Sequence, residues 1–321
     1  PPKKAIMRNR NGLIDLPKVE PSQLRENLQC IRDGKAIKLK SIETALWFLP
    51  LVTHALKGGV RTIFQFSEYL SKKHGTTSIF VIYSYSGVDF DLDILCESLQ
   101  QNFPSLKFIL RKFRKGIDKE QNLPRSQVAF CTLWTTAYLL MRYNKTFRKF
   151  YFMQDFEPMF YPGDEVYMTI EQTYRLGFSC IANTTGVGDR FKQYSSDVVC
   201  FTPGVDTSIF FPDKQFITEE NPKVFNIVYY GRPENSRNAF FLGIDVLKSL
   251  KRKMGNRVSI RSAGADWDPK AFGASGVIEN LGLIKTIEEV ASLYRYSHAG
   301  LVFMATPHPS YQPLEYMASG C

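Results

Sequence analysis

The stretch "FNIVYYGRPENSRNAF" (residues 225–240) combines an apolar run, a polar turn and the start of a helical pattern. Its first six residues are mostly apolar, which is typical of a buried strand in a parallel sheet. Beyond the turn, apolar side chains recur at helical spacing and predict a helix over 238–254 that ends at Gly255. The turn itself carries Arg232 and Arg237. Two positive charges beside a helix N-terminus predict an anion site, and a solvated turn is the alternative. The predicted apolar stripe of the helix is Phe240, Phe241, Ile244, Leu247, Leu250 and Met254.

Short apolar runs alternate with helical patterns through most of the chain, which predicts an α/β fold with parallel sheets and crossover helices. The predicted strands are 46–52, 78–83, 106–110, 127–131, 149–153, 179–182, 198–201, 225–230, 258–262, 277–280 and 300–303. The other predicted helices are 62–73, 92–102, 134–142, 165–176, 187–194, 287–296 and 312–319.

A chain of 321 residues favours two domains. The polar segment 210–223 has prolines near both ends and predicts a linker. We therefore expect a domain over 1–212, with 1–41 as a leading arm, and a second domain over 213–321. The chain ends at "EYMASGC" directly after a helical pattern, so we expect the second domain to be truncated and the parent protein to continue with a strand and helices.

Composition limits the class of protein. No run approaches the roughly 20 apolar residues that span a bilayer, and the first residues lack the apolar core of a secretory signal. The six cysteines are scattered, which favours reduced thiols over disulfides or a zinc site. The net charge of +10 implies acidic partners. The basic segment 107–119 is interpreted as a solvated surface or as a contact with an anionic membrane. A nucleic-acid-binding protein is disfavoured, because no matching motif accompanies the charge.

Four segments in order resemble glycosyltransferase family 4, whose members have the GT-B fold. They are "FTPGVDTSIFFP" (201–212), "YYGRPENSRNAF" (229–240), "VIENLGLIKTIEEVASLYRYSHAGLVFM" (277–304) and "PLEYMASG" (313–320). Upstream, "ALKGGVRTI" (55–63), "CTLWTTAYLL" (131–140) and "YFMQDFEPMFYP" (151–162) resemble the bacterial rhamnosyltransferase branch. The resemblance implies two Rossmann-like domains whose parallel sheets face each other across a cleft, the first on the acceptor side and the second binding the nucleotide sugar.

The same resemblance implies roles for residues of the second domain. Arg232 and Arg237 would hold the donor diphosphate, and the backbone N–H groups of Ser310 and Tyr311 would meet it too. Glu315 would accept hydrogen bonds from the ribose, although a surface carboxylate is the alternative. Residues 263–267 and 280–285 are the loops in which base contacts are expected, with Gly264 and Leu283 as the candidates.

Further candidate site residues are expected near the donor diphosphate, the sugar and the acceptor. Gly58 and Gly59 precede a predicted helix and would let the backbone approach the diphosphate, or would form an ordinary turn. Asp155 and Glu157 in "QDFEP" would face the sugar and the acceptor, or would be solvated at a strand end. The family's second glutamate is replaced by Pro307, next to His308. We therefore take His308 and Asp155 as the catalytic candidates, and the loss of that glutamate is compatible with a deoxysugar donor.

The resemblance implies a retaining hexosyltransferase (EC 2.4.1 type) that moves rhamnose from dTDP-rhamnose to a hydroxyl of a bacterial surface glycan. The predicted partners are the nucleotide sugar and an oligosaccharide acceptor, including a lipid-linked one. The expected location is the cytoplasm, at the inner face of the membrane. No metal or other cofactor is expected, because the arginines can neutralise the diphosphate and the D-x-D motif at 89–91 follows a surface loop. The alternative is a catalytically degenerate module that binds nucleotide or glycan.

Overall fold

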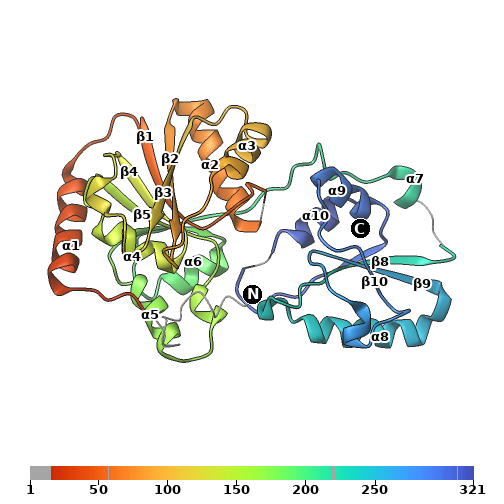
Figure 1. Cartoon of the computed structure of the whole chain (residues 1–321). Helices are drawn as coiled ribbons and strands as arrows, with labels where there is room; N and C mark the ends of the chain where they lie inside the picture. The colour runs from red at the N-terminus through yellow and green to blue at the C-terminus, as the bar shows by residue number, and fades with distance from the viewer. Residues whose placement is uncertain (1–15, 57, 218–221, 309) are drawn as a thin grey trace. The chain divides into compact units, whose positions relative to one another are not determined.

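The computed structural model describes residues 16–56, 58–217, 222–308 and 310–321. The chain divides into two compact units, one up to Phe201 and one from Thr202 (Figure 1). Every strand pair in both sheets is parallel. The predicted α/β class with a parallel sheet in each half of the chain is therefore confirmed.

The first unit has a seven-stranded sheet in the order β3-β2-β1-β4-β5-β6-β7. Its strands are β1 (Thr44–Pro50), β2 (Thr77–Ser84), β3 (Phe108–Arg114), β4 (Val128–Cys131), β5 (Arg148–Met153), β6 (Ser179–Asn183) and β7 (Val198–Phe201). Its helices are α1 (Pro21–Ala36), α2 (Gly58–His74), α3 (Asp93–Asn102), α4 (Trp134–Arg142), α5 (Glu165–Thr173) and α6 (Thr185–Phe191), with 3₁₀ turns η2 (Glu120–Asn122) and η3 (Glu157–Phe160).

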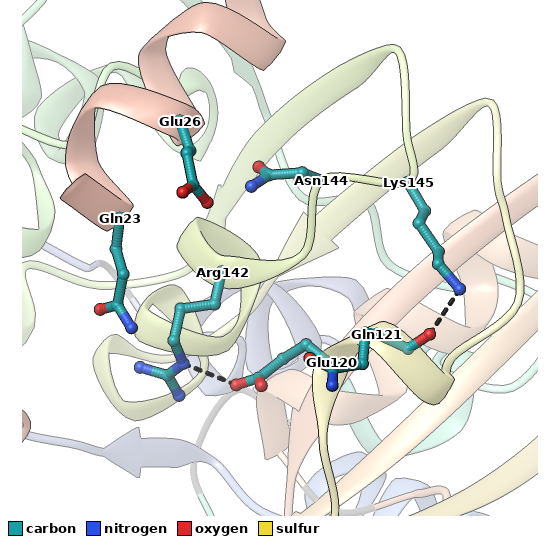
Figure 2. Close-up of a pocket in the computed structure, with 7 residues that line it drawn as sticks. All are labelled: Gln23, Glu26, Glu120, Gln121, Arg142, Asn144 and Lys145. Atoms are coloured by element: carbon teal, nitrogen blue, oxygen red, sulfur yellow. Dashed lines mark hydrogen bonds and ion pairs between the residues drawn. The ribbon is translucent and has the colours of Figure 1, made fainter.

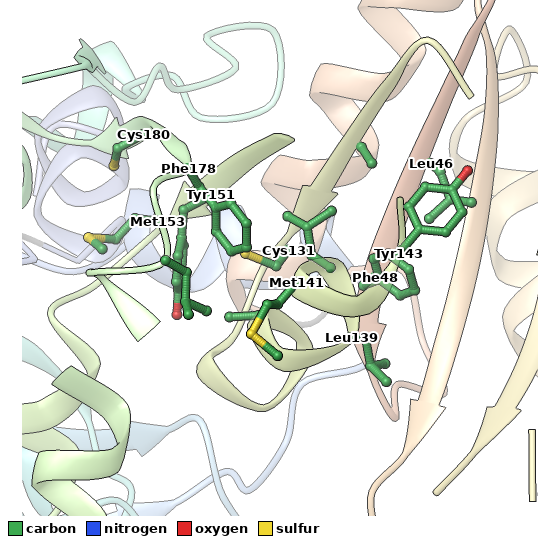
Figure 3. Close-up of a cluster of buried hydrophobic side chains, with 14 of the residues drawn as sticks. Leu46, Phe48, Cys131, Leu139, Met141, Tyr143, Tyr151, Met153, Phe178 and Cys180 are labelled. Atoms are coloured by element: carbon green, nitrogen blue, oxygen red, sulfur yellow. The ribbon is translucent and has the colours of Figure 1, made fainter. Parts of the chain in front are cut away.

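Strand β1 lies in the middle of this sheet and shows why its sequence is a continuous apolar run. Leu46 and Phe48 pack into the core on the side of α4, and Figure 3 shows them with other residues of that core. Trp47 faces the opposite core beneath α2 and α3, where it stacks on Phe130 with ring centroids 3.8 Å apart. Both faces of the strand are therefore shielded from water, as expected for a parallel sheet.

Strand β3 runs to Arg114, whereas the sequence predicted that it ends at residue 110. It is the edge strand of the sheet, and Arg111 and Lys112 on it are exposed. An edge strand has an open side, so charged residues are tolerated there. The basic segment 107–119 is therefore in large part a sheet edge.

Helix α1 corrects the prediction that residues 1–41 form only a leading arm, within the part of that range that the structure describes. Its buried Asn27 accepts a hydrogen bond from Lys149 Nζ at 2.9 Å. Lys149 lies on β5, is only 4% exposed, and donates as well to Asn144 Oδ1 and to the carbonyls of Leu140 and Met141. Burial lowers the pKa of Lys149 to about 8. A buried ammonium group thus joins α1, the end of α4 and the central sheet.

The second unit has a four-stranded sheet in the order β10-β9-β8-β11. Its strands are β8 (Phe225–Tyr230), β9 (Val258–Ala263), β10 (Glu279–Asn280) and β11 (Ala299–Leu301). Its helices are α7 (Lys214–Ile217), α8 (Phe240–Met254), α9 (Ile287–Arg295) and α10 (Gln312–Ala318), with 3₁₀ turns η4 (Ser236–Asn238), η5 (Gly255–Arg257) and η6 (Pro269–Phe272).

The unit boundary lies earlier in the chain than the predicted one at 212/213. Phe210 is buried in a core of the second unit with Val228 and Tyr294. Arg295 of α9 donates to the carbonyls of Phe211 and Ile209, at 3.0 and 3.2 Å. The first part of the predicted linker therefore packs on the second unit, and residues 218–221 of it lie outside the described residues.

Helix α8 follows the predicted stripe except at one position. Phe240, Ile244 and Leu247 are buried, but Phe241 is 68% exposed because it lies on the solvent side of the first turn. The helix ends at Gly255 as predicted.

Two further observations concern the whole described chain. The six cysteines are free thiols, as their spacing predicted. Among the described residues, no helix has the length and apolar content that a membrane span requires.

Candidate functional site

The strand–turn–helix of residues 225–240 places Arg232 just beyond the carboxyl end of β8. The N–H of Gly231 donates to the carbonyl of Ala263 at 3.0 Å, which extends the β8–β9 pairing to the turn. Arg232 Nε donates to Glu234 Oε1 at 3.0 Å, and its Nη1 donates to the hydroxyl of Tyr230 at 3.2 Å. The guanidinium is therefore held at the sheet edge, where ligands of open α/β sheets bind. An anion that binds there must compete with Glu234.

Arg237 lies in η4, directly before α8. The N–H of Ala305 donates to the Arg237 carbonyl at 2.8 Å, and Asn238 Nδ2 donates to the carbonyl of Phe303 at 3.1 Å. These bonds fix the segment after β11 against the turn that carries both arginines. Arg237 Nε is buried. The structure thus brings the two predicted diphosphate residues to one edge of the second sheet.

Gly264, predicted to contact the nucleoside, follows β9 and lies against Arg232. Its φ of 118° is rarely adopted by residues with a side chain. A Cβ there would lie 2.7 Å from Tyr230 Cε2 and 3.3 Å from Arg232 Cγ. The Gly264 N–H also donates to the carbonyl of Gly282 at 3.0 Å, which draws the loop of Leu283 to the same edge. Leu283 is 66% exposed, so its side chain is open to a ligand.

The segment before α10 contains the remaining candidates of the second unit. The N–H of Ser310 donates to His308 Nδ1 at 2.9 Å. The Ser310 N–H was predicted to meet the diphosphate, but here it is engaged by the histidine ring. Tyr311 is the N-cap residue of α10, and its carbonyl accepts the N–H of Glu315 at 3.1 Å.

Glu315 is half-buried on α10 beside a group of tyrosines. Burial raises the pKa of Tyr316 well above its ordinary value, and the Glu315 carboxylate and the Tyr230 phenol add to the effect. Tyr316, the next residue of α10, packs in the same core as Val228 of β8, so Glu315 lies on a helix that covers this strand. The predicted role of Glu315 itself remains a prediction.

In the first unit, the structure brings Gly59 and the "QDFEP" segment together at the carboxyl end of β5. Helix α2 begins at Gly58, so both glycines belong to its first turn rather than to a preceding loop. A Cβ on Gly59 would lie 2.6 Å from Gln154 Oε1, and Gln154 Nε2 donates to the Gly59 carbonyl at 2.5 Å. Gln154 was missed as a candidate because no sequence spacing links it to the glycines. Asp155 is buried, and its Oδ1 accepts the N–H of Phe156 at 2.8 Å.

Glu157 has a different environment from the solvated or acceptor-facing one that the sequence predicted. It is 3% exposed. Its Oε2 accepts the N–H of Trp134 at 2.6 Å, in the first turn of α4, and the hydroxyl of Tyr151 at 3.2 Å. A carboxylate at a helix N-terminus is favourable both as a cap and for the helix dipole. The structure therefore gives Glu157 a role in the core of this unit, and an acceptor contact has no support from its surroundings.

The Glu157→Gln variant tests this assignment. The amide replaces the charged carboxylate that accepts hydrogen bonds from the Trp134 N–H and the Tyr151 hydroxyl. We therefore expect the free energy of unfolding to fall by about 1–2 kcal/mol. Urea unfolding measures this, with the exposed Glu97→Gln on α3 as the control. Equal stability of the two variants would contradict the capping role.

A separate polar hollow of about 380 Å³ lies at the other end of this unit (Figure 2). Asn144 and Lys145 line it from the turn before β5, whereas Gln154 and Asp155 follow that strand. Arg142 donates to Glu120 at 2.7 Å across its floor. The hollow is thus at the amino end of β5 and apart from the predicted site residues.

Among the described residues, no three histidine, cysteine, aspartate or glutamate side chains are grouped closely enough to hold a metal ion. The prediction that the reaction needs no metal remains a prediction.

Comparisons with known proteins agree with this architecture. Residues 225–321 match the family model of the WsaF C-terminal domain. The chain is 37% identical over 281 residues to the O-antigen biosynthesis protein RfbC of Myxococcus xanthus, which covers 87% of this chain. The match covers only 21% of that relative, so the chain spans about a fifth of its length.

Solved structures show the fold. The lipopolysaccharide outer core galactosyltransferase WaaB matches 86% of this chain and 78% of its own, at a TM-score of 0.56 and 13% identity. A glycosyltransferase from Rickettsia africae matches 88% of this chain and 78% of its own, at a TM-score of 0.57 and 15% identity. The chain has the fold of the GT-B glycosyltransferases.

Proposed function

We propose that the chain is part of a nucleotide-sugar-dependent glycosyltransferase that builds a bacterial surface glycan. The observation that carries this proposal is the gathering of Arg232, Arg237 and Gly264 at the carboxyl edge of the second sheet. Two guanidinium groups beside a glycine loop suit a diphosphate, which arginine binds in a bidentate manner. The O-antigen role in the name of the M. xanthus relative supports a surface glycan as the product.

The finer proposal follows the family 4 resemblance and its rhamnosyltransferase branch. The donor is dTDP-rhamnose, and the acceptor is a hydroxyl of an oligosaccharide, including a lipid-linked one. Transfer retains the anomeric configuration. The bond between the sugar C1 and the diphosphate oxygen breaks as the acceptor oxygen bonds C1 on the same face, and the hydroxyl proton passes to the leaving phosphate. Arg232 and Arg237 stabilise the charge that develops on that phosphate, which is the preorganised electrostatic help that such a step needs.

A panel of nucleotide sugars tests the proposal on the full-length protein. We expect release of nucleoside diphosphate from dTDP-rhamnose and from few others. Binding of nucleotide without transfer or hydrolysis from any donor would favour the degenerate module, for which the replacement of the family glutamate by Pro307 is the motivation. Failure to bind any nucleotide would overturn both.

We also propose that the protein works at the cytoplasmic face of the membrane and that the basic edge of the first unit contacts anionic lipid. Near the end of β3, Lys112 pairs with Asp89 at 3.5 Å and Arg114 with Asp118 at 3.1 Å, so part of the charge is neutralised locally. Val88 and Ile117 are exposed in the loops beside them. An apolar and basic edge of this kind suits a membrane surface.

Vesicle sedimentation tests the contact. Binding to phosphatidylcholine vesicles that contain phosphatidylglycerol is expected to fall steeply with added salt, because charges are screened within about 8 Å at physiological ionic strength. Lys112→Glu is expected to weaken it several-fold, with Lys253→Glu on α8 as the charge-matched control. Equal binding to neutral and anionic vesicles would reject the contact.

A further inference from the structure

Ser310, two residues after His308, has an unusual backbone conformation. Ser310 has a φ of 69°, in the left-handed region that residues with a side chain rarely adopt. In this conformation its N–H points back at His308 and donates to Nδ1 at 2.9 Å. Both residues are buried, with 9% of His308 and 5% of Ser310 exposed. Strained backbone of this kind is frequent at ligand sites, where the surrounding structure holds it in place.

The hydrogen bond determines which nitrogen of the ring carries the proton. A nitrogen that accepts an N–H has no proton of its own, so a neutral His308 carries its proton on Nε2. Protonation of Nδ1 would place two N–H groups face to face and break the contact. The Ser310 N–H therefore favours one neutral tautomer and opposes the imidazolium form.

The position of His308 makes this tautomer relevant to the proposed reaction. The segment leading to it is tied to the arginine turn, because Ala305 donates to the carbonyl of Arg237 and Phe303 accepts from Asn238. Its ring centroid lies 5.8 Å from that of Tyr311, at the start of α10. His308 is thus in the same segment as the predicted diphosphate and ribose residues.

We propose that His308 acts as a neutral hydrogen-bond donor, through Nε2, to an oxygen of the bound nucleotide sugar, and that Ser310 is the positioning residue that fixes this state. The proposal rests on the proposed function. A carboxylate in this place could only accept hydrogen bonds from sugar hydroxyls, whereas this ring donates. The oxygen it recognises is therefore an acceptor, on the phosphate or on the sugar, and the ring adds no net charge.

The tautomer can be measured without activity, by ¹⁵N NMR of the histidine rings in the full chain. We expect an unprotonated Nδ1 and a protonated Nε2 for His308 at neutral pH. His298 is an internal control, because its Nδ1 accepts the N–H of Asn226 at 2.9 Å. The His308→Asn variant assigns the signal. Ser310→Gly keeps the N–H and suits the left-handed backbone, so the pattern of His308 should persist in it. A protonated Nδ1 on His308 would overturn the proposal.

Three substitutions of His308 test whether the side chain at this position must donate a hydrogen bond or accept one. Gln places an amide N–H near the position of Nε2, Glu has the same length but only accepts, and Asn keeps an acceptor for the Ser310 N–H but loses the distant donor. We expect kcat to stay within about tenfold for Gln and to fall about 10²-fold for Glu and Asn, the scale of losing one preorganised donor. A kcat of the His308→Glu variant equal to or above that of His308→Gln would overturn the proposal, since the site would then need a hydrogen-bond acceptor.

Calorimetry distinguishes whether His308 binds an oxygen of the phosphate or an oxygen of the sugar. Weaker binding of free dTDP by the Asn variant indicates the phosphate, and weaker binding of dTDP-rhamnose alone indicates the sugar. Unchanged binding of both, with unchanged kcat, would overturn the proposal. Wild-type protein that binds no nucleotide would instead overturn the proposed function, while the NMR result would still establish or reject the tautomer.

Discussion

The double substitution Arg232→Ala, Arg237→Ala is expected to weaken binding of a nucleoside diphosphate by about 10²- to 10⁴-fold. Each arginine should contribute about 1.5–3 kcal/mol, the scale of a hydrogen bond between charged groups, which is roughly 10- to 150-fold in affinity. The two cations belong to one turn at the carboxyl edge of the sheet, and Arg232 lies beside Gly264, so we expect both to reach one ligand. Calorimetric titration with dTDP measures the single and double variants.

Two controls make this result specific. Arg252→Ala removes a charge from the last turn of α8, and it should leave the affinity nearly unchanged because it lies at the far end of that helix. Glu234→Gln removes the carboxylate that holds Arg232 Nε. Its side chain is 54% exposed, so this ion pair is weak and its loss should raise the affinity a few-fold at most. Unchanged affinity in the double variant would remove both arginines from the binding site.

The sheets could be predicted from the sequence because their central strands, such as β1 and β2, are nearly continuous apolar runs. Helix α1 could not, since it is held by contacts that local patterns do not reveal. Its buried face contains Asn27, and its last turn is bonded by Arg148 of β5, which donates to the carbonyls of Gly34 and Ile37. The residues that bind α1 thus lie more than a hundred positions away in the chain.

The candidate site was predictable in part for a similar reason. The spacing of Arg232 and Arg237 is local, so a strand–turn–helix pattern was enough to indicate an anion site. The approach of Gly264 to Arg232 is a tertiary contact that the sequence did not predict, since Gly264 was a candidate only for a nucleoside contact. The buried position of Glu157 depends on the start of α4, which precedes it by more than twenty residues. The bond between Ser310 and His308 depends on a left-handed backbone that no residue type signals, because serine rarely adopts it.

The Lys149→Met variant is expected to have the largest effect on stability. Methionine fills the space of the lysine stem but leaves Asn27, Asn144 and two carbonyls of α4 without their buried donor. Leaving a buried acceptor without its donor costs about 1–3 kcal/mol, so with several acceptors affected we expect a net loss of about 3–5 kcal/mol at pH 7. Urea unfolding followed by tryptophan fluorescence reports on this unit, because Trp47 and Trp134 are buried in it.

The pH dependence of that loss tests whether a buried ammonium group causes it. The pKa of Lys149 is lowered to about 8 in the folded chain, from an ordinary value of 10.5. Below pH 8 the group is charged in both states, and its full burial penalty is present. Between pH 8 and 10.5 the unfolded chain binds more protons than the folded one, so the wild type gains stability as the pH rises. The difference between the wild type and Lys149→Met should therefore grow by about 2 kcal/mol from pH 7 to 9.5.

Tyrosines that titrate at higher pH are common to both proteins and cancel in the difference. Lys119→Met, at an exposed position, should change stability by less than about 0.5 kcal/mol at either pH. A difference that is the same at both pH values would show that burial does not lower the pKa of Lys149.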